Sequence, residues 1–233
     1  MGIPIRRRRR SNNEPVDQLV ADLRAALEPS RVRTDGAELT LLARDASVFD
    51  GGASGPVCFP VNADEVSQVV QIASRHGRAF VPRGAGTGLA GGAIPLGVPV
   101  VIALTKMNEI LEVDLVNRVA WVQPGVINLD LTNHLRPLGY HFAPDPSSQQ
   151  VCTIGGNLAN NSGGPHCLAY GVTDAHILAI EVVLATGEVV MLGGLDAEPT
   201  GFDLRGGFVG SEGTLGIATR IAVRLTPNPP AVR

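Results

Sequence analysis

Aromatic side chains and cysteines are scarce in this chain. Phe, Trp and Tyr make up 4 % of the 233 residues, too few for the base-stacking platforms of proteins that bind single-stranded nucleic acids. The three cysteines (Cys58, Cys152 and Cys167) form no C-x-x-C pair and are odd in number, which predicts free thiols in a reducing cytosol. The five histidines are scattered, so the sequence offers no tetrahedral ligand set and predicts no metal site.

Long apolar runs are also missing, and basic charge is concentrated at one end. No stretch approaches the 18 apolar residues that a membrane span requires. Removing Arg6–Arg10 from the 19 basic residues leaves 14 against 22 acidic ones. Such a run can bind nucleic acid or an anionic membrane, but no basic face follows it, so we expect a disordered leader over residues 1–14. Polar residues 11–15 follow where a secretory signal would need an apolar segment.

Glycine, by contrast, is plentiful, with 28 residues, and it gathers in particular loops. The most informative of these loops is Pro82-Arg83-Gly84-Ala85-Gly86-Thr87-Gly88, which directly follows the apolar segment 78–81. Glycine adopts positive φ at little cost and lets several backbone N–H groups converge on phosphate oxygens. The loop therefore predicts that the protein holds a phosphate-bearing cofactor.

The hydrophobic pattern predicts an α+β fold. Residues 15–28 and 62–77 have helical spacing of apolar residues, and segments 57–60, 79–81 and 98–104 are expected to be strands. Two hairpins are expected, one pairing 110–114 with 119–122 and one pairing 177–185 with 188–192, with a short helix over 129–135 and a last strand over 217–225. The order is one β-α-β lobe followed by a larger, mostly antiparallel sheet with helices.

These elements suggest three parts of the chain. They are the leader (1–14), an N-terminal helical segment (15–51) and a cofactor domain (52–228). The glycines at 51, 52 and 55 mark the second boundary, and the prolines at 227, 229 and 230 are expected to form a linker.

The dinucleotide fingerprint of NAD-binding proteins fits the glycine loop poorly. Residues 86–91 match G-x-G-x-x-G, but that motif needs a helix immediately after it, with the helix N-terminus facing the pyrophosphate. Pro95, Gly97 and Pro99 follow too soon for such a helix. We therefore expect a loop whose own backbone N–H groups bind the phosphate.

Further polar and glycine-rich segments lie downstream, at 144–148, 153–164 and 210–217. Each one alone could be an ordinary loop. Three such segments exceed what one phosphate needs, and they suit a long ligand with a pyrophosphate, a ribityl chain and a polar ring edge.

These motifs resemble the FAD-binding domain of the vanillyl-alcohol oxidase/p-cresol methylhydroxylase (PCMH) type. Within that family the chain is most similar to FAD-linked D-2-hydroxy-acid oxidoreductases, such as the D subunit of glycolate oxidase and D-lactate dehydrogenases. The resemblance covers residues 35–228. It rests on P-R-G-x-G-T-G at 82–88, P-D-P-S-S at 144–148, T-I-G-G-N at 153–157, N-S-G-G-P-H-C at 161–167 followed by Tyr170-Gly171, and G-S-E-G-T-L-G-I at 210–217.

The resemblance implies that FAD is the cofactor and that four groups of residues contact it. The glycine loop would wrap the pyrophosphate, residues of 144–147 would line the channel near the flavin, the 153–171 group would add further donors, and the 213–217 group would pack on one end of the cofactor. The implied contacts are Pro82, Arg83, Gly84, Ala85, Gly86, Thr87, Gly88, Pro144, Asp145, Ser147, Thr153, Ile154, Gly155, Gly156, Asn157, Asn160, Asn161, Gly163, Tyr170, Gly171, Gly213 and Ile217.

Position 87 predicts how FAD is held. Some relatives carry a histidine in the glycine loop that bonds covalently to the flavin, whereas Thr87 stands here. We therefore expect FAD to be bound non-covalently. His166 is a weaker covalent candidate, with packing in a polar loop as the alternative.

The resemblance also implies a reaction and what this chain does not supply. Related proteins oxidise a small 2-hydroxy acid, of the glycolate or D-lactate type, by hydride transfer to flavin, and the flavin carries the difficult step. Their C-terminal substrate (cap) domain supplies the carboxylate-binding arginine and the base. We expect that domain to be absent from residues 1–233, so no catalytic residue is assigned. Two hypotheses remain open. In one, the chain is the cofactor portion of such an oxidoreductase; in the other, it is a flavin-binding module that works only with other oxidase subunits and an electron acceptor. A cytoplasmic location is expected, with membrane association only through partner subunits.

Overall fold

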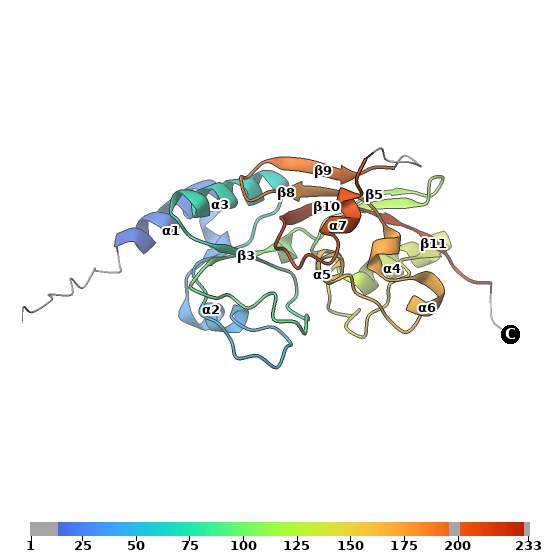
Figure 1. The fold of residues 1–233 in the computed structure, drawn as a ribbon, viewed down its shortest axis with the longest axis horizontal. Helices are drawn as coiled ribbons and strands as arrows, with labels where there is room; N and C mark the ends of the chain where they lie inside the picture. Colours follow the sequence, from blue (N-terminus) through green and yellow to red (C-terminus); the bar gives the residue numbers. More distant parts are fainter. Residues whose placement is uncertain (1–13, 196–200, 231–233) are drawn as a thin grey trace, which may run out of the picture.

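The computed structural model describes residues 14–195 and 201–230, which form two lobes built on separate sheets (Figure 1). The predicted leader, including Arg6–Arg10, lies outside the described residues, except that Glu14 begins the first helix, α1 (Glu14–Ala26). The observed architecture confirms the expected α+β class, with one small parallel lobe and one larger antiparallel lobe. Among the described helices, none has both the length and the apolar character to cross a membrane.

The small lobe contains a four-stranded sheet in the order β1-β2-β4-β3. Its strands are β1 (Val32–Arg33), β2 (Val57–Cys58), β3 (Phe80–Arg83) and β4 (Val100–Ala103). Strands β2, β3 and β4 run parallel, and β1 is antiparallel to β2. The predicted β-α-β unit is present, but β4 lies between its two strands. The backbone therefore leaves β3, at the edge of the sheet, directly into the glycine loop.

Helix α3 (Ala63–Arg75) connects β2 to β3 and forms as its sequence predicts. The side chain of Asn62 accepts a hydrogen bond from the backbone N–H of Glu65 at 2.9 Å, which caps the helix N-terminus. After its C-cap, Gly77 adopts φ +59°. The apolar face of α3 packs with α1 and β4 in one core, to which Leu19, Leu23, Val66, Val69, Val70, Ile102 and Met107 contribute.

The segment before the predicted boundary at residue 51 packs on this lobe. Besides α1 it contains a 3₁₀ turn (Pro29–Arg31), β1 and α2 (Gly36–Leu42). Strand β1 pairs with β2, and Arg31 makes an ion pair with Glu65 of α3. The three-part division stays a prediction, but backbone pairing crosses its second boundary.

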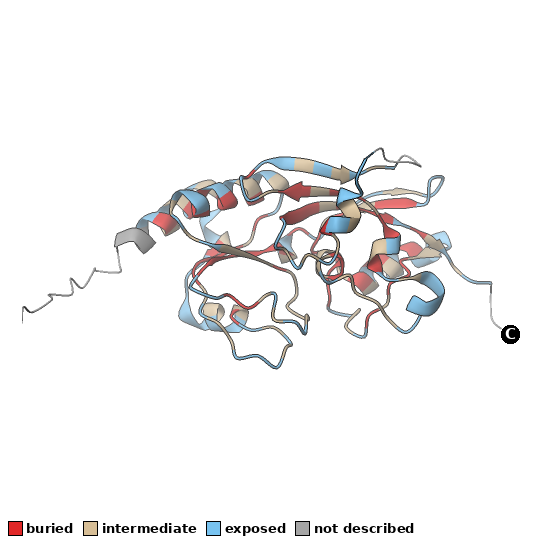
Figure 2. Cartoon of the chain, in the orientation of Figure 1, coloured by how far each residue is buried: buried red, intermediate tan, exposed pale blue. Residues whose placement is uncertain are grey.

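The second lobe contains a five-stranded antiparallel sheet in the order β5-β6-β10-β8-β9. The strands are β5 (Ile110–Asp114), β6 (Val119–Val122), β8 (Ile177–Val183), β9 (Val189–Gly193) and β10 (Ile217–Arg224). Both predicted hairpins are confirmed by the β5–β6 and β8–β9 pairings. Strands β6, β8 and β10 are mostly buried, whereas β9 is partly exposed (Figure 2).

Three helices cover one face of this sheet (Figure 1). They are α4 (Asn128–Leu135), α5 (Ile154–Asn160) and α7 (Leu204–Phe208), and they contribute Leu131, Ile154 and Phe208 to its core. Sequence analysis predicted only α4. The remaining short elements are α6 (Cys167–Tyr170), β7 (Tyr140–His141) and 3₁₀ turns over Leu104–Lys106, Arg136–Leu138 and Thr173–His176.

The prediction of a proline-rich linker is wrong for its first residue, Pro227. Pro227 belongs to β11 (Thr226–Pro227), which pairs with β7. Proline lacks a backbone donor, but a two-stranded edge pairing tolerates this loss.

Candidate cofactor site

A cleft of about 910 Å³ lies where the two lobes meet. Its volume falls within the range of about 300–1,000 Å³ that small-molecule sites occupy. The lining comes from the glycine loop after β3, the 146–148 turn, the α5 region and the segment around the start of β10. Segments far apart in the sequence therefore converge on one cavity.

The glycine loop continues from β3 without a helix, as the sequence predicts. Gly86 has φ +73°, a left-handed conformation that side chains rarely adopt, whereas Gly84 is outside that region. Gly84 is constrained in another way, since a Cβ there would stand 2.6 Å from Oγ1 of Thr153. The loop thus needs glycine at 86 for its backbone angle and at 84 for its close approach to α5.

The backbone N–H groups of this loop are free to bind a ligand. Among the described residues, no acceptor pairs with the amides of Ala85, Gly86, Thr87 or Gly88, all of which line the cleft. Buried or partly buried amides that lack a partner are costly unless water or a ligand satisfies them. Several such donors on one concave loop form an anion-binding arrangement.

Helix α5 contributes differently from what was expected. Thr153 caps it by accepting a hydrogen bond from the N–H of Gly156 at 3.2 Å. The amides of Ile154 and Gly155 are bonded to the carbonyl oxygens of Val126 and Pro124, each at 2.8 Å. The amides at 154–156 are therefore already paired, so this helix start shapes the cleft while the glycine loop presents the free donors.

Three buried polar side-chain atoms on the cleft wall also lack partners among the described residues. They are Nδ2 of Asn157, Oγ of Ser211 and Oδ2 of Asp45. Asn157 is only 1 % exposed, so its amide donor cannot be satisfied by bulk water. Buried polar groups are ordinarily hydrogen-bonded, and their grouping here fits a cleft that binds a polar ligand.

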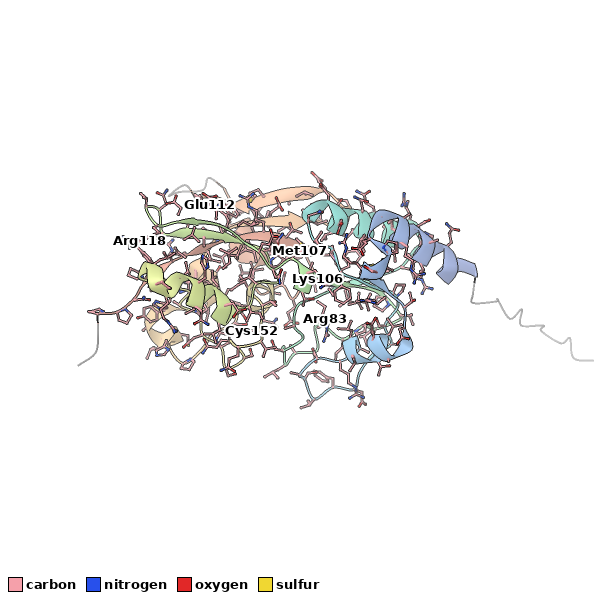
Figure 3. The ribbon with its side chains drawn as sticks, turned by 180° about the vertical axis from the view of Figure 1, so that it is seen from behind. Arg83, Lys106, Met107, Glu112, Arg118 and Cys152 are labelled. Carbon is pink, nitrogen blue, oxygen red and sulfur yellow. The ribbon has the colours of Figure 1, made fainter. Side chains whose placement is uncertain are left out.

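Arg83 lies beneath the glycine loop. It is 6 % exposed, its Nη1 donates to the carbonyl of Ala93 at 3.5 Å, and a Cβ on Gly86 would clash with its Nη2. Burial lowers the pKa of the guanidinium, and the negative charge of Asp45 partly opposes that shift. The Arg83 guanidinium thus packs against Gly86 of the loop. Figure 3 labels Arg83 together with Cys152, which precedes α5.

The cysteines offer no reactive thiolate near the cleft. Burial raises the pKa of Cys58 to about 12 and also raises the pKa of Cys152. Cys167 is exposed and unpaired. Within the described part of the chain, no group of three or more potential ligands could hold a metal ion.

The structure brings most of the predicted contact residues to the cleft. Those that line it are Pro82, Arg83, Gly84, Ala85, Gly86, Thr87, Gly88, Ser147, Thr153, Gly155, Gly156, Asn157, Asn160, Gly163, Gly213 and Ile217. Six others do not line it, namely Pro144, Asp145, Ile154, Asn161, Tyr170 and Gly171.

Each of the six has a structural role nearby. Ile154 is buried in the second core, and the carbonyl of Pro144 accepts a hydrogen bond from Asn128 at 2.9 Å. Asn161 caps α5 with φ +46° and accepts from the N–H of Asp174 at 2.9 Å. Asp145 pairs with Nδ1 of His166 at 2.5 Å.

The last two of the six lie at the end of α6. The carbonyl of Tyr170 is bonded to the buried His176 at 2.8 Å, and Gly171 has φ +84°. His166 is 68 % exposed in its side chain and does not line the cleft.

Sequence analysis missed several lining residues, including Asp45, Ser148, Phe208, Ser211 and Glu212. Ser211 and Glu212 belong to the G-S-E-G-T-L-G-I motif at 210–217 but were not singled out. Glu212 has φ +53°, a backbone conformation that the sequence does not reveal. Asp45 carried no pattern that would have singled it out. Asp45, Glu212 and Arg83 are the charged side chains on the described cleft wall.

Comparison with known proteins matches this cleft-bearing region to one family. The family model described as "FAD binding domain" matches residues 56–193. The chain is 48 % identical over 174 residues to the glycolate oxidase subunit GlcD of Bacillus subtilis (strain 168), covering 74 % of this chain and 37 % of that protein. It is 41 % identical over 172 residues to a D-lactate dehydrogenase of Anaerostipes hadrus, covering 73 % and 36 %. The chain therefore spans little more than a third of the length of these relatives.

Solved structures share the fold. An alkyldihydroxyacetonephosphate synthase superposes with a TM-score of 0.83 at 26 % identity, covering 92 % of this chain and 41 % of that one. A substrate-bound p-cresol methylhydroxylase superposes with a TM-score of 0.81 at 23 % identity, covering 94 % and 45 %. At that identity the second comparison establishes the fold alone.

Proposed function

The chain belongs to the FAD binding domain family and shares the fold of p-cresol methylhydroxylase, and on that premise we propose that it is the FAD-holding part of an oxidoreductase that oxidises a 2-hydroxy acid. FAD is the cofactor of this family. The proposed substrates are of the glycolate or D-lactate type, because the relatives at 48 % and 41 % identity carry those names.

The unpaired amides of the glycine loop are the observation that carries the proposal. The N–H groups of residues 85–88 line a cleft of suitable size and have no acceptor in the described protein. An FAD pyrophosphate would accept hydrogen bonds from them.

The remaining orphaned donors suit the uncharged parts of FAD. Nδ2 of Asn157 and Oγ of Ser211 are buried and without partners, so each can donate to a ribityl, ribose or ring-edge oxygen. Both atoms are buried without a partner, so a hydrogen bond to FAD would remove an unsatisfied polar group. Each such bond therefore contributes more to the free energy of binding. Thr87 stands in the glycine loop, where some relatives carry the histidine that bonds to the flavin. We therefore propose that FAD binds non-covalently.

When bound, FAD supplies a flavin ring that accepts a hydride from the C2 carbon of the substrate. The residues of this chain bind and orient the cofactor. The base that takes the substrate hydroxyl proton and the cation that binds its carboxylate are not assigned to any residue here.

A second candidate is a flavin-binding module that works only inside a larger complex, together with other subunits and an electron acceptor. The name of the Bacillus subtilis relative, a glycolate oxidase subunit, supports this alternative. Both candidates require FAD binding, and they differ in what completes the substrate pocket, which is a further domain of the same protein in the first and another subunit in the second.

Anaerobic reduction of the FAD-loaded chain tests whether its own residues complete the substrate pocket. Glycolate and D-lactate are added in turn, with L-lactate as a control, while the visible flavin band is followed. Bleaching by glycolate or D-lactate supports hydroxy-acid oxidation by this chain. A flavin band that persists with all three means that the pocket needs residues outside this chain, as both candidates expect, and a reading frame directly downstream that encodes a substrate domain then favours the first candidate.

A further inference from the structure

Arg83 is a buried cation without a contacting anion. Its side chain is almost fully shielded, at 6 % exposure, and the ion pairs of the described residues do not include it. Its one hydrogen bond, to the carbonyl of Ala93, is long at 3.5 Å. A charge removed from water is costly unless an opposite charge or several hydrogen bonds compensate it.

Asp45 carries the opposite charge. It lines the same cleft as Arg83. Its Oδ1 accepts the backbone N–H of Ser47 at 2.9 Å, while its Oδ2 is buried and has no partner among the described residues. The Asp45 charge raises the pKa of Arg83 against the lowering effect of burial, so the two groups attract one another across the space between them.

The backbone around Asp45 packs against the 91–95 segment, which follows the glycine loop in the chain. The N–H of Gly52 donates to the carbonyl of Ala43 at 2.9 Å, and the N–H of Ala53 donates to that of Pro95 at 3.1 Å. A Cβ on Gly91 would stand 3.0 Å from the ring of Phe49. Residues 43–53 therefore follow the 91–95 segment closely, and Asp45 from the first and Ala93, the partner of Arg83, from the second both line the cleft.

We propose that Asp45 is a positioning residue that acts as the counter-charge of Arg83 and, through Arg83, keeps the glycine loop in its phosphate-binding conformation. Arg83 lies directly behind Gly86, so a displaced guanidinium would shift the loop amides. Asp45 precedes the residues matched by the family model, which begin at 56. The ligand part of this inference rests on the proposed function.

A double-mutant cycle on the FAD-free chain tests the charge pair itself. Asp45→Asn and Arg83→Met are each expected to lower the melting temperature, and the double variant is expected to lose less than the sum of the two, because each single change leaves an uncompensated partner. Asp50→Asn, on the exposed part of the same segment, is the matched control and is expected to be neutral. Additive losses, or an Asp45→Asn variant indistinguishable from Asp50→Asn, would overturn the proposal.

Ligand titrations test the effect on the loop. Asp45→Asn is expected to weaken binding of FAD and of ADP about tenfold, which corresponds to about 1.4 kcal/mol, and to leave riboflavin binding unchanged. An equal loss for riboflavin would mean that Oδ2 contacts the ligand directly, and would overturn the positioning role. If the unmodified chain binds none of these ligands, the proposed function fails, and the melting-temperature cycle still decides whether Asp45 and Arg83 are coupled.

Discussion

Gly84 and Thr153 come from different lobes and meet at the floor of the cleft, where a Cβ on Gly84 would stand 2.6 Å from Oγ1 of Thr153. Thr153 is also the N-cap of α5. The turn after β3 and the start of α5 are thereby held together, and the free amides of the glycine loop face the same cavity as Asn157.

Gly84→Ala tests this contact. The added methyl group has to displace Thr153 or the loop, at a cost of about 1–3 kcal/mol in unfolding free energy, and FAD affinity should fall at least about tenfold. Gly36→Ala is the control, because nothing lies within 4 Å of a Cβ there. Chemical denaturation and flavin fluorescence titration measure the two effects. If Gly84→Ala behaves like Gly36→Ala in both, the close approach is not required.

Gly86→Ala tests the left-handed backbone of the loop. At φ +73°, alanine costs about 1–2 kcal/mol in unfolding free energy, and the methyl group would also displace Arg83. Gly77→Ala separates these effects, since Gly77 has φ +59° with nothing within 4 Å. Both variants should lose stability, but only Gly86→Ala should lose FAD affinity. Comparable FAD affinity in the two variants would contradict the loop assignment.

Thr153→Ala tests the cap of α5. Loss of its hydrogen bond to Gly156 should cost about 1 kcal/mol of stability and should weaken FAD binding, since α5 forms one wall of the cleft. Asn62→Ala removes the equivalent cap of α3, which lies away from the cleft lining. Calorimetry should give similar stability losses for the two variants, and isothermal titration with FAD should distinguish them. Unaltered FAD binding by Thr153→Ala would exclude a role for the cap in the site.

His176 predicts an acid-sensitive fold. Burial is the main cause that lowers the pKa of His176 below its usual 6.5, and the charges of Arg224 and His141 act in the same direction. In the window between 6.5 and the lowered pKa, the unfolded imidazole is protonated while the folded one is neutral, so stability is present above 6.5 and is lost as the pH falls through that window.

His176→Gln removes this titrating group and retains a hydrogen-bond donor for the carbonyl of Tyr170. Unfolding free energies measured from pH 7.5 down to 5 should decline less steeply for the variant than for the unmodified chain. Parallel pH profiles would show that another group causes any acid sensitivity.

Much of the fold was predictable because its elements carry local signals. Helix α3 has a capping asparagine and a continuous apolar face, and the hairpins around 115–118 and 186–187 follow the alternation of apolar residues. Helix α5 was missed because its sequence, Ile154–Asn160, contains two glycines, and its formation depends on burial of Ile154 and Leu158 in the second core.

The sequence predicted the part of the site that is rich in glycine, and it missed the residues that reach the cleft through tertiary contacts. The loop at 82–88 could be identified from composition, since its glycines permit both the positive φ at 86 and the close approach at 84. Asp45 reaches the cleft through the packing of residues 43–53 on the 91–95 segment. The paired amides of α5 likewise depend on Pro124 and Val126, whose positions no local pattern indicates.

Titration of the purified chain with FAD, followed by visible absorption and flavin fluorescence, tests the central claim most directly. The account predicts saturable binding at a single site, competition by ADP, and release of unmodified FAD on acid denaturation. A chain that folds but shows no saturable change with FAD would contradict the assignment of the cleft.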